Sequence, residues 1–261
     1  MPLWLFEFGQ YIGAALLTLV TFLLMGLAML PAYCVFDWTY LTFGLPAAIA
    51  TLPVGYLLWG TTFCLEVIIA KRFVVFYKAK PGRFPFVSWN VIGWAIMGYI
   101  VLVAHTTFMQ FLRGTPFMNM WLQGLGANIG RRVNVQTTFT SDWDLLTIDD
   151  DAVLGGDCHV ACHSLEGGHL TFAPVHIGKR TLIGQTSSLL PGVRVEDDGM
   201  VGARSLVTKG TVVDSHAIYA GVPAKLIKYR KQGKGPRGED DVDTPSSDGG
   251  SSDTGSSTSA S

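Results

Sequence analysis

The sequence predicts a membrane-associated α-helical N-terminal half followed by a parallel β-helix built from six-residue repeats. Two observations lead to this prediction. The N-terminal half is apolar and nearly free of charge, and aliphatic residues recur every six positions in the C-terminal half. Overall the chain is 49% hydrophobic and only 15% charged, whereas soluble domains average about 25% charged residues. The charges are segregated along the chain, so the net charge of −1 says little about partners.

Two N-terminal segments are long enough to cross a bilayer. A hydrocarbon core of ~30 Å needs about 20 apolar residues in a helix, so we expect spanning helices over about 11–31 and 41–70. The loop that follows is basic, with Lys71, Arg72, Lys78, Lys80 and Arg83. Because cytoplasmic loops are enriched in Lys and Arg, we expect this loop and the N-terminus in the cytosol, with residues 32–40 outside.

A third apolar segment, 84–112, contains no Asp, Glu, Lys or Arg. If it spans the membrane, the C-terminal half lies outside the cell. If it is an in-plane or re-entrant segment, the C-terminal half stays in the cytosol. We expect the second arrangement, which makes residues 1–112 the membrane-associated part and 113–124 a connector.

The remaining composition excludes several classes of partner and site. The basic runs lack the interleaved aromatic residues of a single-strand nucleic-acid site, so no nucleic acid is expected. The four cysteines are spaced like reduced cytosolic thiols rather than a disulfide framework. The tail, 231–261, is acidic and rich in Ser and Gly, and is expected to be disordered because it cannot bury a core.

The C-terminal half, 125–230, carries the repeat. Its period requires a coil with three flat sides, each a short strand with one aliphatic residue pointing inward and a small residue at the tight corner. Breaks in phase at 136–147 and 163–176 predict loops that project from the coils. The inward positions are expected to be Ile129, Val135, Ile148, Leu154, Val160, Ile177, Ile183, Leu189, Val195, Val201, Val207, Val213 and Tyr219.

The stretch Ile177–Lys228 resembles the hexapeptide-repeat acyltransferase superfamily. The similar motifs are Val201–Ser205 (VGARS), Val207–Lys209 (VTK) and the ending Ala220–Ile227 (AGVPAKLI). This resemblance implies a left-handed parallel β-helix that assembles as a homotrimer or pseudo-trimer. The motifs are specific to the superfamily but not to a substrate.

A narrower resemblance covers more of the chain. The segments Lys80–Pro85, Ser88–Trp89, Arg113–Phe117 and Leu125–Gly130 are laid out similarly to the membrane-embedded C-terminal region of poly-lysine-synthetase-like nonribosomal peptide synthetases. In that region, β-helical units alternate with pairs of membrane helices. The residues here would match one such unit and include no adenylation or carrier domain, so peptide-bond formation is not expected of them.

Acyl transfer needs a general base, and histidine suits neutral pH. Four histidines gather where the repeat breaks phase: His159, His163, His169 and His176. In the resembling acyltransferases the catalytic histidine opens an extended loop, which implies His163 as the first candidate and His169 as the second. Two other interpretations stay open: surface histidines of an inactive scaffold, and zinc ligands as in γ-type carbonic anhydrases.

The same resemblance implies contacts to the acyl donor, acetyl-CoA or another acyl-CoA. Backbone groups at Ala203 and Thr208 would line the groove for the pantetheine arm. Lys209, Lys225 and Lys228 would meet the phosphates, for which a lysine is a suitable point charge. No metal is expected.

These observations predict a multi-pass membrane-anchored acyltransferase that moves an acetyl-like group from acyl-CoA to a hydroxyl or amine of a small-molecule acceptor. Because acyl-CoA is mainly cytosolic, the β-helix should face the cytosol. The alternative is a non-catalytic assembly module that trimerises and positions a membrane-bound peptide synthetase. A carbonic anhydrase-like metalloprotein is the lesser alternative.

Overall fold

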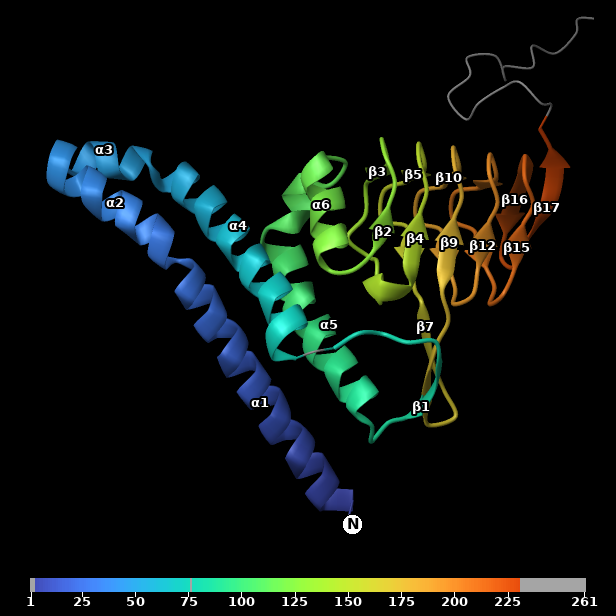
Figure 1. Ribbon diagram of the computed structural model, residues 1–261, viewed down its shortest axis with the longest axis horizontal. Coiled ribbons are helices and arrows are strands. Elements are labelled where there is room, and N and C mark those ends of the chain that lie inside the picture. The colour runs from blue at the N-terminus through green and yellow to red at the C-terminus, as the bar shows by residue number, and fades with distance from the viewer. Residues whose placement is uncertain (1–2, 76, 231–261) are drawn as a thin grey trace, which may run out of the picture.

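The computed structural model describes residues 3–75 and 77–230. A helical half leads into a β-helix (Figure 1). The predicted disordered tail, 231–261, lies outside the described residues. The interior is continuous from the helices that follow the basic loop into the coils of the β-helix, because buried apolar side chains of both parts form one cluster.

The first helices form a long hairpin that projects away from the β-helix (Figure 1). It comprises α1 (Leu3–Ala28), α2 (Leu30–Phe43), α3 (Leu45–Ala50), α4 (Leu52–Ile69) and a π-helical turn at Ala70–Val74. Large apolar side chains face outward over its whole length, among them Phe22, Leu23, Leu27, Leu41, Leu45, Leu52 and Leu57.

The helix boundaries in this hairpin differ from those expected. Residues 32–40 are helical rather than a loop, and the returning helix α4 begins at Leu52 rather than near residue 41. Pro31 lies in the first turn of α2, where its missing N–H costs no hydrogen bond. Gly44, with φ of 85°, ends that helix instead. By length and composition three helices could cross a membrane: Tyr11–Phe43, Leu52–Phe73 and Trp89–Thr107.

The third of these, α5 (Trp89–Thr107), packs between α4 and the β-helix. Its partner α4 approaches very closely at Gly60, where a Cβ atom would lie 2.1 Å from the ring of Phe108. After a 3₁₀ turn at Met109–Leu112, helix α6 (Pro116–Gly124) occupies the segment expected to be a connector. Met118 and Leu122 of α6 are fully buried, so this helix covers the open N-terminal end of the β-helix.

The β-helix consists of three parallel sheets, one for each side of the coil. The first contains β2 (Asn128–Ile129), β4 (Leu146–Ile148), β9 (Val175–Ile177), β12 (Arg194–Val195) and β15 (Val212–Val213). The second contains β3 (Asn134–Val135), β5 (Val153–Leu154), β10 (Leu182–Ile183), β13 (Met200–Val201) and β16 (Ala217–Gly221). The third contains β6 (His159–Val160), β11 (Ser188–Leu189) and β14 (Leu206–Val207). An antiparallel strand, β17 (Ala224–Tyr229), closes the second sheet.

The predicted inward positions are confirmed by burial. Every aliphatic residue of the repeat from Ile129 to Val213 is buried, and most have no exposed surface. Tyr219, in the last coil, is only partly buried. Coils stack in register, since Ile183 pairs with Val201 and Val201 with Tyr219. The interior is therefore a ladder of one aliphatic residue per side per coil.

The corners of the coil are built differently from what the sequence suggests. A left-handed backbone recurs every six residues, at Arg180, Thr186, Gly192, Asp198, Arg204, Gly210 and His216. The glycines that follow the aliphatic residues have another role. A Cβ on Gly184 would lie 2.3 Å from the backbone N of Ala203 in the next coil, and one on Gly178 would lie 2.9 Å from the N of Asp197. These glycines let coils approach each other.

The predicted loop at 163–176 is a β-hairpin. Strands β7 (His163–Glu166) and β8 (His169–Phe172) pair antiparallel and leave the coil between β6 and β9. A third strand, β1 (Gly82–Pro85), joins them from the basic loop of the helical half. The other break, 136–147, contains a 3₁₀ turn at Trp143–Leu145.

A buried ion pair joins the two halves. The Lys71 ammonium lies 2.8 Å from Asp144 Oδ2 and also donates to the carbonyl of Leu125. The backbone N–H of Ala79 donates to the same Asp144 oxygen at 3.0 Å. Lys71, which the sequence assigned to a basic cytosolic loop, is buried. Its burial is possible because a carboxylate on the first coils compensates its charge.

The two valines of β15 provide a test of this arrangement. Val213 has no exposed surface and Val212 is 48% exposed. We expect Val213→Ala to lower the free energy of unfolding by about 2 kcal/mol through lost burial and a cavity. The matched control Val212→Ala should change it by less than ~0.5 kcal/mol. Denaturant unfolding followed by circular dichroism measures both, and equal losses would contradict the inward assignment of Val213.

Candidate functional site

The candidate site lies where the hairpin leaves the coil. His163 is the first residue of β7, directly after the buried Cys162. Its Nδ1 lies 2.6 Å from Asp142 Oδ2 and 3.3 Å from Ser141 Oγ. The distance to Asp142 is that of a strong, charge-assisted hydrogen bond. The structure thus forms a histidine–carboxylate pair from two segments that both break the repeat.

Asp142 was not identified from the sequence. It lies in the break at 136–147, has a left-handed backbone with φ of 54°, and precedes the 3₁₀ turn. Its side chain is 1% exposed, and Ser141 Oγ donates to Oδ2 at 3.0 Å. The sequence feature that could have pointed to Asp142 is its position as an acidic residue in a break of the repeat. Asp144, two residues later, has the same feature, so the sequence does not distinguish them.

Aromatic rings surround the imidazole of His163. The Trp94 ring of α5 meets it edge-on with a centroid distance of 4.8 Å, and Phe172 lies at 6.4 Å. The His163 side chain is 20% exposed, and Nε2 forms no hydrogen bond within residues 3–75 and 77–230. When Nδ1–H donates to Asp142, the Nε2 lone pair is left available to accept a proton.

His169 lies at the far end of the hairpin. In the hairpin pairing His163 faces Phe172, while His169 faces Glu166 beside the turn. Nδ1 of His169 lies 3.3 Å from Arg83 Nη2 and 2.9 Å from the Gly167 carbonyl. The two histidines proposed from the sequence are therefore separated by the length of the hairpin. Of these two, His163 has a carboxylate partner and His169 has none among the described residues.

The other histidines also lie apart. His176 on β9 pairs with Asp149, with Nε2 3.0 Å from Oδ2. His159 on β6 is exposed and interacts electrostatically with His163. In the part of the chain that the structure describes, no three His, Cys, Asp or Glu side chains are placed to hold a metal ion.

All four cysteines are free, and burial raises the pKa of Cys158 to about 12.

The residues proposed for the acyl donor lie at three places. Thr208 and Lys209 follow β14, at the corner from which the hairpin leaves two coils earlier. At this corner Gly192 lies between Ala173, at the end of the hairpin, and Gly210 in the next coil. A Cβ on Gly192 would lie 3.7 Å from the Ala173 Cβ and 3.4 Å from Gly210. Ala203 lies at the preceding corner of the coil, and Lys225 and Lys228 lie on the exposed strand β17.

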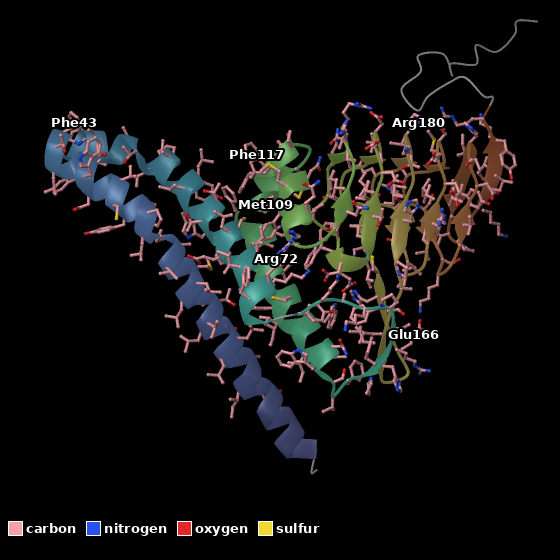
Figure 2. The ribbon with its side chains drawn as sticks, in the orientation of Figure 1. Phe43, Arg72, Met109, Phe117, Glu166 and Arg180 are labelled. Atoms are coloured by element: carbon pink, nitrogen blue, oxygen red, sulfur yellow. The ribbon has the colours of Figure 1, made fainter. Side chains whose placement is uncertain are left out.

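Lys209 contacts the hairpin through an ion pair with Glu166. The Glu166 carboxylate therefore binds a lysine and not an imidazole. Side chains alternate between the faces of a strand, so His163 and Glu166 point to opposite faces of β7. Figure 2 shows Glu166 on the hairpin and Phe43 at the distant end of the helical half.

No model of a known protein family matches the chain, but individual proteins do. It is 24% identical over 185 residues to the delta-poly-L-ornithine synthetase of Acinetobacter baumannii (strain AB307-0294), covering 70% of this chain and 14% of that protein. It is 27% identical over 125 residues to the galactoside O-acetyltransferase of Escherichia coli (strain K12), covering 42% and 61%. A solved galactoside acetyltransferase in complex with coenzyme A aligns with a TM-score of 0.43 at 18% identity, covering 56% and 86%.

The chain is related to the hexapeptide-repeat acyltransferases. The matches confirm the resemblance to this superfamily that the repeat motifs indicate. The chain spans less than two thirds of the synthetase and of the galactoside O-acetyltransferase that it matches. Within this hexapeptide-repeat fold, the His163–Asp142 pair is the arrangement of described residues that best fits general-base chemistry.

The hydrogen bond from His163 to Asp142 predicts a single neutral tautomer with the proton on Nδ1. We expect Asp142→Asn to mix or invert this tautomer, because an amide can also donate to the ring. Imidazole ¹⁵N chemical shifts of labelled protein in detergent measure it. Asp149→Asn is the matched control, since it alters the partner of His176 and should leave the His163 signals unchanged. Unaltered His163 shifts in Asp142→Asn would contradict the assignment.

Proposed function

We propose that the chain is a membrane-anchored acyltransferase that moves an acetyl-like group from acyl-CoA to a hydroxyl or amine. The observation that carries the proposal is the His163–Asp142 pair on the hairpin of a hexapeptide-repeat fold. Nε2 of His163 removes a proton from the acceptor, whose oxygen or nitrogen attacks the thioester carbonyl. The carbon–sulfur bond breaks, and the imidazolium returns the proton to the departing coenzyme A thiolate. Asp142 stabilises the imidazolium formed in between.

The acyl-CoA donor is supported by the relatives, which include the galactoside O-acetyltransferase of Escherichia coli. Lys209 and Thr208 are the donor-binding residues nearest the hairpin. Lys209 binds Glu166, whose side chain points to the opposite face of β7 from His163. This separation supports a homotrimer in which a neighbouring copy helps to complete the donor groove. The acceptor is a small molecule.

Membrane attachment is proposed through the hairpin of α1 to α4. Its outward face is apolar over many turns, and it projects beyond both α5 and the β-helix (Figure 1). Soluble monomers rarely expose a contiguous apolar surface of this extent to water. The hydrocarbon core of a bilayer would surround this surface and remove it from water.

Two contacts support a cytosolic position for the β-helix. The π-helical turn at the end of α4 supplies Lys71 to Asp144, and the loop that follows supplies strand β1 to β8. These contacts favour an arrangement with the loop and the β-helix on the same side of the membrane. A single crossing by α5 would separate them, so we propose that Trp89–Thr107 is an in-plane or re-entrant segment. With the basic loop in the cytosol, the β-helix faces the cytosol as well.

A second candidate function is an assembly module of a membrane-bound peptide synthetase. The observation in its favour is the match to delta-poly-L-ornithine synthetase over 185 residues. That is more than the β-helix alone contains, so the similarity extends into the helical half. In this case the β-helix would trimerise and position catalytic domains without transferring acyl groups itself.

Acetyl-CoA turnover distinguishes the two functions. Purified chain with acetyl-CoA and a panel of amine and alcohol acceptors should release free thiol above background. We expect His163→Ala to lower kcat by ~10²–10⁴-fold, the usual contribution of a general base, while His169→Ala should retain most activity. An inactive wild type, or equal rates for wild type and His163→Ala, would favour the assembly module.

The topology is tested by single cysteines in sealed vesicles. The background variant carries Cys34→Ser, because Cys34 is the exposed cysteine. Lys78→Cys in the loop and Lys228→Cys on β17 are both at exposed positions. We expect a membrane-impermeant maleimide to label both from the same side. Labelling from opposite sides would show that α5 crosses the membrane.

A further inference from the structure

A small cavity lies directly behind the His163–Asp142 pair. Its wall is formed by α5, through Trp94 and Met97, and by the turn that holds Asp142 and Asp144. Tyr77 enters it from the loop between α4 and α5. The cavity volume is ≈ 30 Å³. One ordered water needs about 10–15 Å³ of such volume and two or more polar partners.

Two buried polar atoms belong to residues that line this cavity and have no hydrogen-bond partner: the hydroxyl of Tyr77 and Oδ1 of Asp142. Both residues are more than nine-tenths buried. Buried polar atoms in native proteins are nearly always paired, either with protein or with ordered water. The second carboxylate oxygen of Asp142 is already occupied by His163, so Oδ1 is the atom left to bind a group in the cavity.

We propose that Tyr77 is a positioning residue for the histidine–carboxylate pair, acting through one water held in this cavity. The Tyr77 hydroxyl donates to the water, and the water donates to Asp142 Oδ1. Oδ2 is then the oxygen that accepts Nδ1–H of His163. This inference rests on the proposed acyl transfer for its kinetic consequence, but not for its geometry.

The neighbouring charges suit this arrangement. Asp144 and Lys71 pair beside the cavity, and His159, which does not line it, interacts electrostatically with His163. Burial, and then the negative charges of Asp142 and Asp144, raise the pKa of Tyr77. The phenol therefore stays protonated and remains a hydrogen-bond donor throughout the physiological range.

The position of Tyr77 in the chain gives the contact a further role. The loop that carries it is fixed by Lys71 on one side and by the Ala79 N–H on the other, both bound to Asp144. Removing the loop from the β-helix would remove the water site and free the Asp142 carboxylate to rotate. Tyr77 would thus orient the catalytic base without touching the reacting atoms.

The test compares Tyr77→Phe with Tyr99→Phe in the full chain. Tyr99 is the matched control, because its hydroxyl bonds Thr18 Oγ1 at 3.2 Å on the other face of α5. Loss of a hydrogen bond to a carboxylate predicts about a tenfold fall in kcat for Tyr77→Phe with an unchanged KM for acetyl-CoA. Tyr99→Phe should match wild type in both constants. Wild-type kcat in Tyr77→Phe would overturn the proposal.

A second measurement separates this inference from the proposed function. The ¹⁵N shifts of His163 report its tautomer without any turnover. If wild type proves inactive, the proposed function fails, and the tautomer alone decides the role of Tyr77. A tautomer mixture in Tyr77→Phe, absent from Tyr99→Phe, supports the positioning role. Identical His163 spectra in wild type and Tyr77→Phe overturn it.

Discussion

The buried ion pair between Lys71 and Asp144 is the contact on which the arrangement of the two halves depends. It is compensated on both sides, since Lys71 also binds the Leu125 carbonyl and Asp144 also accepts from the Ala79 N–H. Removing one member of such a pair typically costs 3–5 kcal/mol. The pair fixes the end of α4 at the first coil, which places α5 along the β-helix and brings Trp94 to the imidazole of His163.

The β-helix itself is a rigid support for a site built on its interruptions. Each coil contributes one buried aliphatic residue per side, and parallel pairing continues from coil to coil. Both members of the candidate pair lie where this regularity stops. His163 begins the hairpin and Asp142 precedes the 3₁₀ turn. Residues at such interruptions are free of the inward–outward constraint of the repeat, so their polar side chains can face each other.

The sequence was sufficient to predict the part of the fold that rests on a short repeat. The six-residue period identified the inward residues from Ile129 to Val213, because one aliphatic side chain per strand is a local requirement of the coil. It was insufficient for contacts between distant segments. Nothing in the local pattern around Gly82–Pro85 indicates a strand, since β1 exists only because β8 is available to pair with it. The chain stays helical past Pro31 and α2 ends at Gly44, for a reason visible only in the backbone angles.

The same limit applies to the candidate site. His163 could be chosen because it opens a phase break, which a sequence shows directly. Its partner Asp142 could not, because the distance of 2.6 Å depends on how two interruptions fold back on the same coils. Tyr77 was still further from prediction, since it reaches the site from the helical half. The run of basic residues after the second apolar segment also gave no sign that Lys71 would be buried.

The pairing of β1 with the hairpin has a consequence for how the chain is made. Proteins fold broadly from the N-terminus during synthesis, so the helical hairpin and β1 emerge well before β7 and β8. Strand β1 then has no partner until residue 172 has been added, and closing so long a loop is slow compared with local pairing. The coils before the hairpin can stack on α6 in the meantime. The three-stranded sheet is therefore a late event in biogenesis, and the histidine reaches its final surroundings only after the helices are in place.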